Sequence, residues 1–307
     1  RIKNTFRLKK IKYKTCIIIF PPALGLGDLI ILSRIVDLVK NYEKFDKVKV
    51  ASSAPWVDNK REGVEYFNLK DTDKLVVGDL FIFPTYTFLN FIISKILSSN
   101  KSVGYKYITP KTFLNKEESY INDRRPYFER LKPFSNFFMP GMSLKPIIWS
   151  QEEIKKRKLR SDYVSIEDLK SSINSKNYII SISVYNFYEK FRPNIKIIQG
   201  LLKQKKLEVK RKISVIIIGS NKKKEIEYNK LVCKELNDYC DEIFNSSGLF
   251  NLDQSIDLLT QSNYYLGANN GISNIAQIIG LKCTQIFVGP EKPLVRKFSD
   301  EANIIYY

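Results

Sequence analysis

The chain alternates short apolar runs rich in Ile and Val with segments of helical periodicity, and this alternation limits its fold more than any other feature. Within the runs, apolar residues follow one another directly instead of alternating with polar ones. Strands that are buried on both faces have this pattern, and they occur in parallel sheets that helices cover on both sides. We therefore expect an α/β protein.

The expected strands are Thr15–Phe20, Lys47–Ala51, Leu80–Pro84, Tyr178–Val184, Ile213–Gly219, Glu242–Phe244, Tyr264–Gly267 and Cys283–Val288. Between them lie helical patterns at Leu29–Asn41, Asn194–Lys205, Lys223–Tyr239, Asp253–Gln261 and Ile272–Ile279. The alternation fades between about Pro133 and Ser175, so we expect a domain boundary near residue 160. The sequence thus predicts two Rossmann-like domains, residues 1–160 and 161–307, facing each other across a cleft. Such domains bind ligands at the carboxyl ends of their strands.

The 307 residues include no histidine. This excludes a histidine general base, a histidine-activated nucleophile and histidine metal ligands. The four cysteines form no C-x-x-C pair, and two of them lie inside apolar runs, as small core residues do. We expect a reducing compartment and no metal cluster.

The formal net charge is +19, and the first fourteen residues contain seven basic residues and no acidic one. One interpretation of this charge is that the protein comes from an organism whose proteins are generally rich in lysine. The other is that this basic arm contacts an anionic membrane surface or a phosphorylated substrate. We find no zinc-finger spacing and no RNA-binding aromatic motif, so nucleic acid is not an expected partner. No secretory signal and no membrane span are expected either.

The first predicted strand leads into a glycine loop, and Asp28 stands where the next helix begins. The G-x-G pair suggests a dinucleotide site, but the third glycine is missing and no acidic residue ends the second strand. Asp28 could be a helix N-cap, which is common at such a position. At the carboxyl end of a strand that faces a cleft, it could also serve as a general base.

In the second half, Lys190 and Arg192 lie between a strand and a helix that begins at Pro193. The two cations could clamp a diphosphate, or they could form a solvated basic loop. Gly219 ends the next strand, and Glu225 falls in the first turn of the following helix. This carboxylate could favour the helix dipole or accept hydrogen bonds from ribose hydroxyls.

The segment Tyr265–Pro290 is predicted to form a strand, a tight polar loop, a short helix and a second strand. Asn269, Asn270 and Gly271 occupy the point where the strand gives way to the helix. Backbone N–H groups converge at such a point, and the helix dipole favours a negative ligand there. We therefore expect a phosphate cradle.

Taken in order, these segments resemble the ADP-heptose:lipopolysaccharide heptosyltransferases, glycosyltransferase family 9. The family's G-D pair after the first strand matches Gly27 and Asp28, and its "r-V-G-f" element resembles KSVGYK at Lys101–Lys106. Its K-x-W-P element resembles KFRP at Lys190–Pro193. Its strand ending in glycine, followed by a helix with glutamate, resembles IIIGSNKKKEIE. The closing motif of the family resembles SGLFNLDQSIDLLTQSNYYLGANNGISNIAQIIGLKCTQIFVGP, and the resemblance runs from about Thr15 to Pro290.

The resemblance implies a GT-B fold with an acceptor-side first domain and a donor-nucleotide-binding second domain. It implies an inverting, metal-independent sugar transfer that needs no cofactor. The donor would be a nucleotide-diphosphate sugar, with ADP-heptose expected. The acceptor would be a lipopolysaccharide or lipooligosaccharide core, an anionic glycolipid. The protein would lie on the cytoplasmic face of the inner membrane as a peripheral protein.

The resemblance also assigns roles to single residues. Asp28 would be the catalytic base, Lys190 would contact the donor phosphates, and the N–H groups of Asn270 and Gly271 would hold the diphosphate. Glu225 would contact the donor ribose. The expected donor-binding residues are Lys190, Arg192, Gly219, Glu225, Asn269, Asn270, Gly271 and Asn274. The expected acceptor-side residues are Gly27, Lys60 and Arg61.

The sequence departs from the family pattern at three positions. Asn269 replaces the family aspartate, Asn274 replaces its histidine, and Arg192 stands in place of its tryptophan. An amide can hydrogen-bond a sugar hydroxyl, but it carries no charge and accepts no proton. Two alternatives therefore stay open: a non-catalytic relative that binds a nucleotide or glycan, and a dinucleotide-dependent oxidoreductase. The sequence ends at Tyr307, soon after the last motif, so we also expect a short or trimmed chain.

Overall fold

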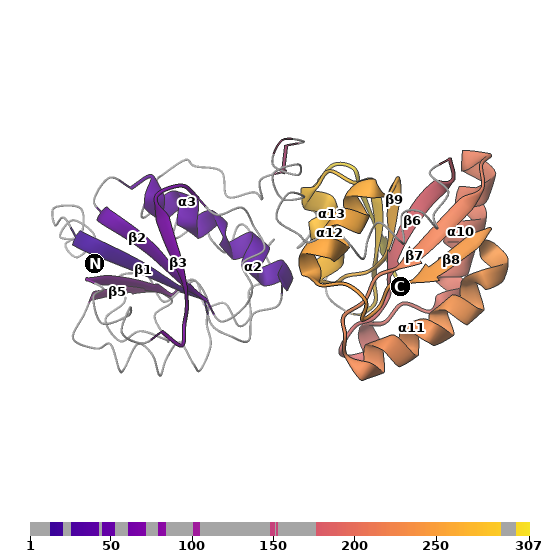
Figure 1. Cartoon of the computed structure of the whole chain (residues 1–307), viewed down its shortest axis with the longest axis horizontal. Helices are drawn as coiled ribbons and strands as arrows, with labels where there is room; N and C mark the ends of the chain where they lie inside the picture. The colour runs from indigo at the N-terminus through magenta and orange to yellow at the C-terminus, as the bar shows by residue number, and fades with distance from the viewer. Residues whose placement is uncertain are drawn as a thin grey trace. The chain divides into compact units, whose positions relative to one another are not determined.

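The computed structural model describes residues 13–20, 26–42, 45–52, 61–71, 79–83, 101–104, 148–150, 152, 176–289 and 299–307. The chain divides into two compact units, residues 1–146 and 147–307, and each unit contains one parallel sheet (Figure 1). The α/β class expected from the sequence is therefore confirmed. The predicted boundary near residue 160 lies outside the described residues.

The first unit is built on a five-stranded sheet with the order β3-β2-β1-β4-β5. Its strands are β1 (Tyr13–Phe20), β2 (Phe45–Ser52), β3 (Val64–Asn68), β4 (Leu80–Phe83) and β5 (Lys101–Gly104). The central strand β1 is fully buried from Cys16 to Phe20. On one of its faces, Ile17 and Ile19 pack with Phe67 and Phe81. The continuous Ile run thus marks the strand with neighbours on both edges.

Two short helices follow β1 where the sequence pattern predicts one. They are α2 (Leu26–Leu32) and α3 (Arg34–Lys40), which buries its apolar side chains against the unit. The helical run is interrupted at Ser33, whose Oγ donates a hydrogen bond of 2.6 Å to the carbonyl of Ile30. Serine side chains compete in this way with the backbone ladder of a helix.

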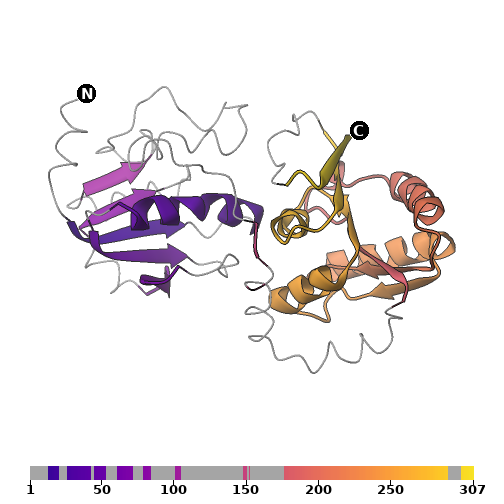
Figure 2. The same ribbon diagram turned by 90° about the horizontal axis from the view of Figure 1, so that it is seen from above.

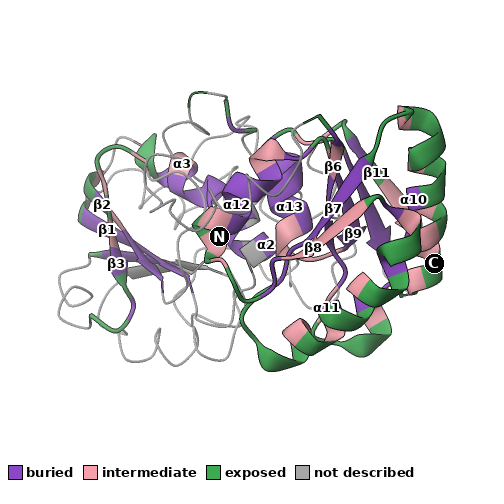
Figure 3. Ribbon diagram, turned by 45° about the vertical axis from the view of Figure 1, so that its right-hand side comes forward, coloured by how far each residue is buried: buried purple, intermediate pink, exposed green. Residues whose placement is uncertain are grey.

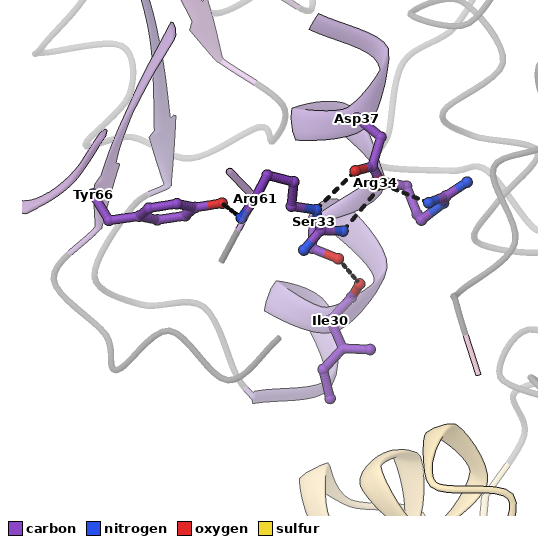
Figure 4. Close-up of polar contacts among 6 residues, drawn as sticks. All are labelled: Ile30, Ser33, Arg34, Asp37, Arg61 and Tyr66. Atoms are coloured by element: carbon purple, nitrogen blue, oxygen red, sulfur yellow. Dashed lines mark hydrogen bonds and ion pairs between the residues drawn. The ribbon is translucent and has the colours of Figure 1, made fainter. Parts of the chain in front are cut away.

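A buried ion cluster ties α3 to the segment that enters β3 (Figure 4). The Asp37 carboxylate accepts hydrogen bonds from Arg61 Nε at 2.7 Å and from Arg61 Nη2 at 3.0 Å. Arg34 Nη1 bonds the same carboxylate, and the three side chains are between 10% and 13% exposed. The Arg61 N–H also donates to the Tyr66 hydroxyl at 3.1 Å. The side chain of Arg61 therefore has a structural function in this unit.

The second unit is built on a six-stranded parallel sheet with the order β11-β10-β9-β6-β7-β8. Its strands are β6 (Tyr178–Ser183), β7 (Ile213–Ile217), β8 (Glu242–Asn245), β9 (Tyr264–Ala268), β10 (Cys283–Phe287) and β11 (Ala302–Tyr306). Counted along the chain within this unit, the order is that of a dinucleotide-binding fold. From β6, the strands β7 and β8 extend the sheet in one direction, and β9, β10 and β11 extend it in the other. The neighbours β6 and β9 are therefore the strands between which the order reverses. Ligands of such sheets bind at this switch point.

In the described part of this unit, four helices cover the sheet: α10 (Ile195–Val209), α11 (Lys223–Leu236), α12 (Leu252–Gln261) and α13 (Gly271–Ile278). Figure 1 shows α12 and α13 on one face of the sheet and α10 and α11 on the other. Viewed from above, the sheet lies between these two layers of helices (Figure 2). Under α10 and α11 the core consists of Ile, Val and Leu side chains from both layers. Exposed residues lie on the outer side of both helices (Figure 3).

All the predicted strands form, but three further strands were not predicted. They are β3, β5 and β11, and each forms an edge of its sheet. Only one residue of β3 and one residue of β11 are buried, so their sequences contain no long apolar run. None of the helices among the described residues is both long and apolar enough to cross a membrane.

We expect Asp37→Asn to lower the free energy of unfolding by about 3–5 kcal/mol, because both arginines lose the carboxylate that neutralises them in a buried place. Glu65→Gln is the matched control. Its pair with Lys49, at 2.8 Å, leaves Glu65 47% exposed, and its loss should cost under about 1 kcal/mol. Urea unfolding followed by circular dichroism measures both. Equal effects would contradict the structural role of the cluster.

Candidate functional site

At the switch point, the loops after β6 and β9 are joined by the Asn270 side chain. Its Nδ2 donates to Ser183 Oγ at 2.9 Å and lies 3.3 Å from the carbonyl oxygen of Tyr185. In the opposite direction, Asn186 Nδ2 reaches the carbonyl of Asn269 at 3.5 Å. The two loops are thus held as one polar surface at the carboxyl edge of the sheet.

Below these loops, β6 and β9 approach unusually closely at Gly267. A Cβ atom on Gly267 would lie 2.2 Å from the Ser183 carbonyl oxygen and 2.8 Å from the Tyr265 hydroxyl. The Tyr265 hydroxyl donates to the same carbonyl at 3.3 Å. Burial raises the pKa of Tyr265 well above its usual value, so this phenol stays a neutral donor. Only glycine leaves room for this arrangement.

Helix α13 begins at this surface. A capping box at its start satisfies two of the backbone N–H groups there, those of Asn270 and Ser273. Asn270 Oδ1 accepts from the Ser273 N–H at 3.1 Å, and Ser273 Oγ accepts from the Asn270 N–H at 3.1 Å. Within the described part of the chain, the N–H groups of Gly271 and Ile272 have no acceptor. These two groups, on half-buried residues, are the donors available for an anion at the positive end of the helix. The sequence had indicated the N–H groups of Asn270 and Gly271.

Beside β6, the end of β7 carries a second polar cluster around Gly219. A Cβ there would lie 2.4 Å from Asn229 Nδ2, 2.7 Å from Ser247 Oγ and 3.1 Å from Glu225 Oε1. Asn229 Nδ2 donates to Ser247 Oγ at 2.7 Å, and Ser220 Oγ donates to the Glu225 carboxylate. Glu225 is half-buried, so its carboxylate can accept hydrogen bonds from a polyol such as ribose.

The two asparagines at the departures from the family pattern have different environments. Asn269 is half-buried, and its Oδ1 accepts from Gln285 Nε2 at 3.0 Å. Asn274 is fully buried, and neither its amide nitrogen nor its amide oxygen has a hydrogen-bond partner among the described residues. A ligand outside the protein cannot reach Asn274 in this structure.

Gln285 is a member of this site that the sequence analysis missed. It is fully buried on β10, and its Nε2 donates to Ser273 Oγ at 2.6 Å as well as to Asn269. Its bonds fix the N-terminal turn of α13 from below. The available signal was a lone amide in the otherwise mostly apolar strand CTQIF.

The loop after β6 carries Lys190 and Arg192 in a short 3-10 turn, Glu189–Phe191, and just after it. Lys190 is exposed, and its ammonium lies 5.0 Å from the centroid of the Phe191 ring. Arg192 differs, because its side chain is only 14% exposed. Its guanidinium carbon lies 4.3 Å from the ring centroid of Tyr185. Of the two predicted clamp residues, only Lys190 presents its cation to solvent.

The predicted acceptor-side residues and the predicted base lie in the first unit. Gly27 and Asp28 are the second and third residues of α2, and only the backbone of Asp28 is described. Arg61 belongs to the ion cluster with Asp37. Lys60 lies outside the described residues. The catalytic function of Asp28 and the acceptor-side assignments stay predictions.

In the described residues, no group of three or more Cys, Asp or Glu side chains is arranged to hold a metal ion. The four cysteines are free thiols, and three of them are buried. Burial raises the pKa of Cys233 and of Cys240 to about 11. These two thiols are protonated at neutral pH and are poor nucleophiles.

No family model matches the sequence, and no curated protein matches it. Solved structures do match it along almost its whole length. ADP-heptose LPS heptosyltransferase II of E. coli is 15% identical, with a TM-score of 0.63 over 95% of this chain and 90% of that one. A family 9 glycosyl transferase of Veillonella parvula is 11% identical, with a TM-score of 0.69 over 97% and 87%. E. coli heptosyltransferase WaaC with ADP is 9% identical, with a TM-score of 0.59 over 95% and 93%. The chain therefore has the GT-B fold of these enzymes, as the sequence resemblance implied.

We expect Gly267→Ala to lower the free energy of unfolding by roughly 3 kcal/mol, because the added methyl group must push β6 and β9 apart. Gly200→Ala is the control. Apart from its chain neighbours and the backbone of its own helix, no atom of the described residues lies within 4 Å of a Cβ at Gly200, in the exposed middle of α10. Alanine there should stabilise the protein by about 0.5–1 kcal/mol. Chemical unfolding of both variants gives the comparison. A neutral Gly267→Ala would mean that the close approach is not a constraint.

Proposed function

We propose that the chain is a glycosyltransferase that moves a sugar from a nucleotide-diphosphate donor to an anionic glycolipid acceptor. One observation supports this most strongly. The free N–H groups of Gly271 and Ile272 and the Glu225 carboxylate lie around the carboxyl edge of one sheet, near the β6/β9 switch point. An anion-binding helix end and a polyol-binding carboxylate suit the two halves of a nucleoside diphosphate.

The donor that we propose is ADP-heptose. Its support is the shared fold, since solved structures with the same fold are described as an E. coli heptosyltransferase with ADP and with ADP-2-deoxy-2-fluoro heptose. The proposed acceptor is a lipopolysaccharide or lipooligosaccharide core. The basic N-terminal arm, with seven basic residues in fourteen, suits peripheral contact with the cytoplasmic face of the inner membrane.

On the donor side, the protein's task is to bind and neutralise the diphosphate. The N–H groups of Gly271 and Ile272 would donate to its oxygens, and Lys190 would supply a mobile positive charge from the loop after β6. As the bond between the anomeric carbon and the diphosphate oxygen breaks, negative charge grows on that oxygen. Preorganised donors at a helix end stabilise such charge without reorganising. Glu225 would fix the nucleoside through its ribose.

On the acceptor side, Asp28 would act as the general base. It would take the proton from the acceptor hydroxyl while the hydroxyl oxygen forms a bond to the anomeric carbon. The nucleoside diphosphate leaves from the opposite face, so the configuration at that carbon inverts. The proposed mechanism uses no metal ion, since the leaving charge is met by N–H groups and Lys190.

A nucleotide-binding protein without turnover is the second candidate. Its support is the neutral amide at Asn269, where family members carry an aspartate. The Asn269 amide oxygen already accepts a hydrogen bond from Gln285 Nε2, and an amide cannot accept a proton from a reacting group.

A donor panel distinguishes these two functions. We expect release of nucleoside diphosphate from one of the ADP-, UDP-, GDP- or dTDP-sugars when lipooligosaccharide is present, with chelator added. Asp28→Asn should lower kcat by at least about 100-fold, the usual contribution of a general base. The exposed Asp238 provides the control variant, Asp238→Asn. Nucleotide binding without turnover on any donor would favour the second candidate.

The proposed ribose contact is tested separately. We expect Glu225→Gln to weaken ADP binding about tenfold, because a hydrogen bond to a charged acceptor is lost, while pyrophosphate binding stays unchanged. Glu227→Gln is the control, since Glu227 is exposed on the same helix. Isothermal titration calorimetry measures the affinities of the wild type and of both variants for ADP and for pyrophosphate. An equal loss for ADP and pyrophosphate would refute a contact to the nucleoside.

A further inference from the structure

Arg192 packs against two tyrosine rings that come from different elements. Its guanidinium carbon is 4.3 Å from the ring centroid of Tyr185 and 4.8 Å from that of Tyr228. Tyr185 follows β6, and Tyr228 lies on α11. The two rings also meet edge to face, with centroids 5.9 Å apart. A guanidinium that lies over aromatic rings and is largely desolvated is attracted to them electrostatically.

The edges of the same guanidinium group are also engaged. Arg192 Nε donates to the Asn186 carbonyl at 2.8 Å, and Nη1 lies 3.3 Å from Glu189 Oε1. With two tyrosine rings packed against it, two of its N–H groups bonded and its side chain only 14% exposed, the guanidinium has little surface left for an incoming phosphate. This is the environment of an organising group and not of a mobile phosphate ligand.

The contacts of Arg192 with Tyr185 and Tyr228 connect the diphosphate and ribose parts of the proposed donor site. Tyr185 offers its carbonyl to Asn270 Nδ2 at 3.3 Å, so it is bonded to the residue that caps α13. Tyr228 is three residues after Glu225 on α11, and residues with this spacing share one face of a helix. Arg192 thus joins the helix end proposed for the diphosphate to the helix proposed for the ribose.

We propose that Arg192 is a positioning residue whose planar guanidinium acts as a plate that packs against both Tyr185 and Tyr228 and holds the diphosphate and ribose parts of the donor site at a fixed spacing. This inference rests on the proposed function. It assigns Arg192 a different task from the phosphate contact expected from the sequence. The plate needs a planar group and one N–H donor, and the indole ring of tryptophan offers both.

Substitutions at Arg192 separate the plate from a charged phosphate ligand, with ADP as the probe. For a plate, Arg192→Ala and Arg192→Lys should each weaken ADP binding about tenfold, because neither side chain stacks as a plane. Arg192→Trp should stay within about twofold of the wild type. For a phosphate ligand the order reverses, since Lys keeps the charge and Trp loses it. That reversed order would overturn the proposal.

Salt dependence gives a second distinction. Loss of a phosphate-binding cation reduces the effect of salt on ADP affinity, because salt screens that charge pair. Arg192→Trp should leave the effect of salt unchanged if the guanidinium does not touch the phosphate. Arg211→Trp is the matched control, since the exposed Arg211 lies over the Tyr178 ring, at 5.5 Å, in the turn before β7.

Amide hydrogen exchange of the free protein tests the plate even if the wild type binds no nucleoside diphosphate, a result that would refute the proposed function alone. Arg192→Ala should speed exchange about tenfold or more at residues 185–192 and at Asn270. Arg192→Trp should restore protection, and Tyr228→Leu should mimic Arg192→Ala. Unchanged exchange in Arg192→Ala would overturn the inference.

Discussion

The second unit depends on one close contact, the approach of the β9 backbone at Gly267 to the Ser183 carbonyl on β6. These strands are the neighbours between which the sheet changes its direction of growth. Because they lie so close, Asn270 can reach Ser183 and Tyr185 across the gap with one amide group. The start of α13 is set by these bonds. Every feature that we assign to donor binding is placed relative to that pair of strands.

Much of this arrangement follows from the sequence by local rules. Strands with neighbours on both edges, such as β1 and β7, contain runs of Ile and Val and were predicted. The polar turn at Asn269–Gly271 was also predicted, because asparagine before a glycine that opens a helix is a strong capping signal. The edge strands β3, β5 and β11 were missed, and β3 and β11 show that a strand at the edge of a sheet needs few apolar residues.

What could not be predicted concerns partners that are distant in sequence. From the segment KFRP alone, Arg192 is expected to be a solvated cation. Nothing in this segment indicates that the ring of Tyr228, on α11, packs against the guanidinium. Gln285 follows Asn269 by sixteen residues and meets it only because β9 and β10 are paired. Asp28 and Arg61 were selected by sequence, yet Arg61 is held in an ion cluster whose other members lie on α3. Propensity and spacing do not encode such long-range pairings.

The amide network at the start of α13 has a consequence for how the site responds to acidity. The network consists of side-chain amides and one hydroxyl, from Asn269, Asn270, Ser273 and Gln285, which hydrogen-bond one another. These groups neither gain nor lose a proton over the pH range in which proteins are folded. An aspartate or histidine in their place would titrate and would change the local field as it did so. The charge of this hydrogen-bond network therefore does not change with pH. Any effect of acidity on a bound anion would have to come from the anion itself or from groups outside the network.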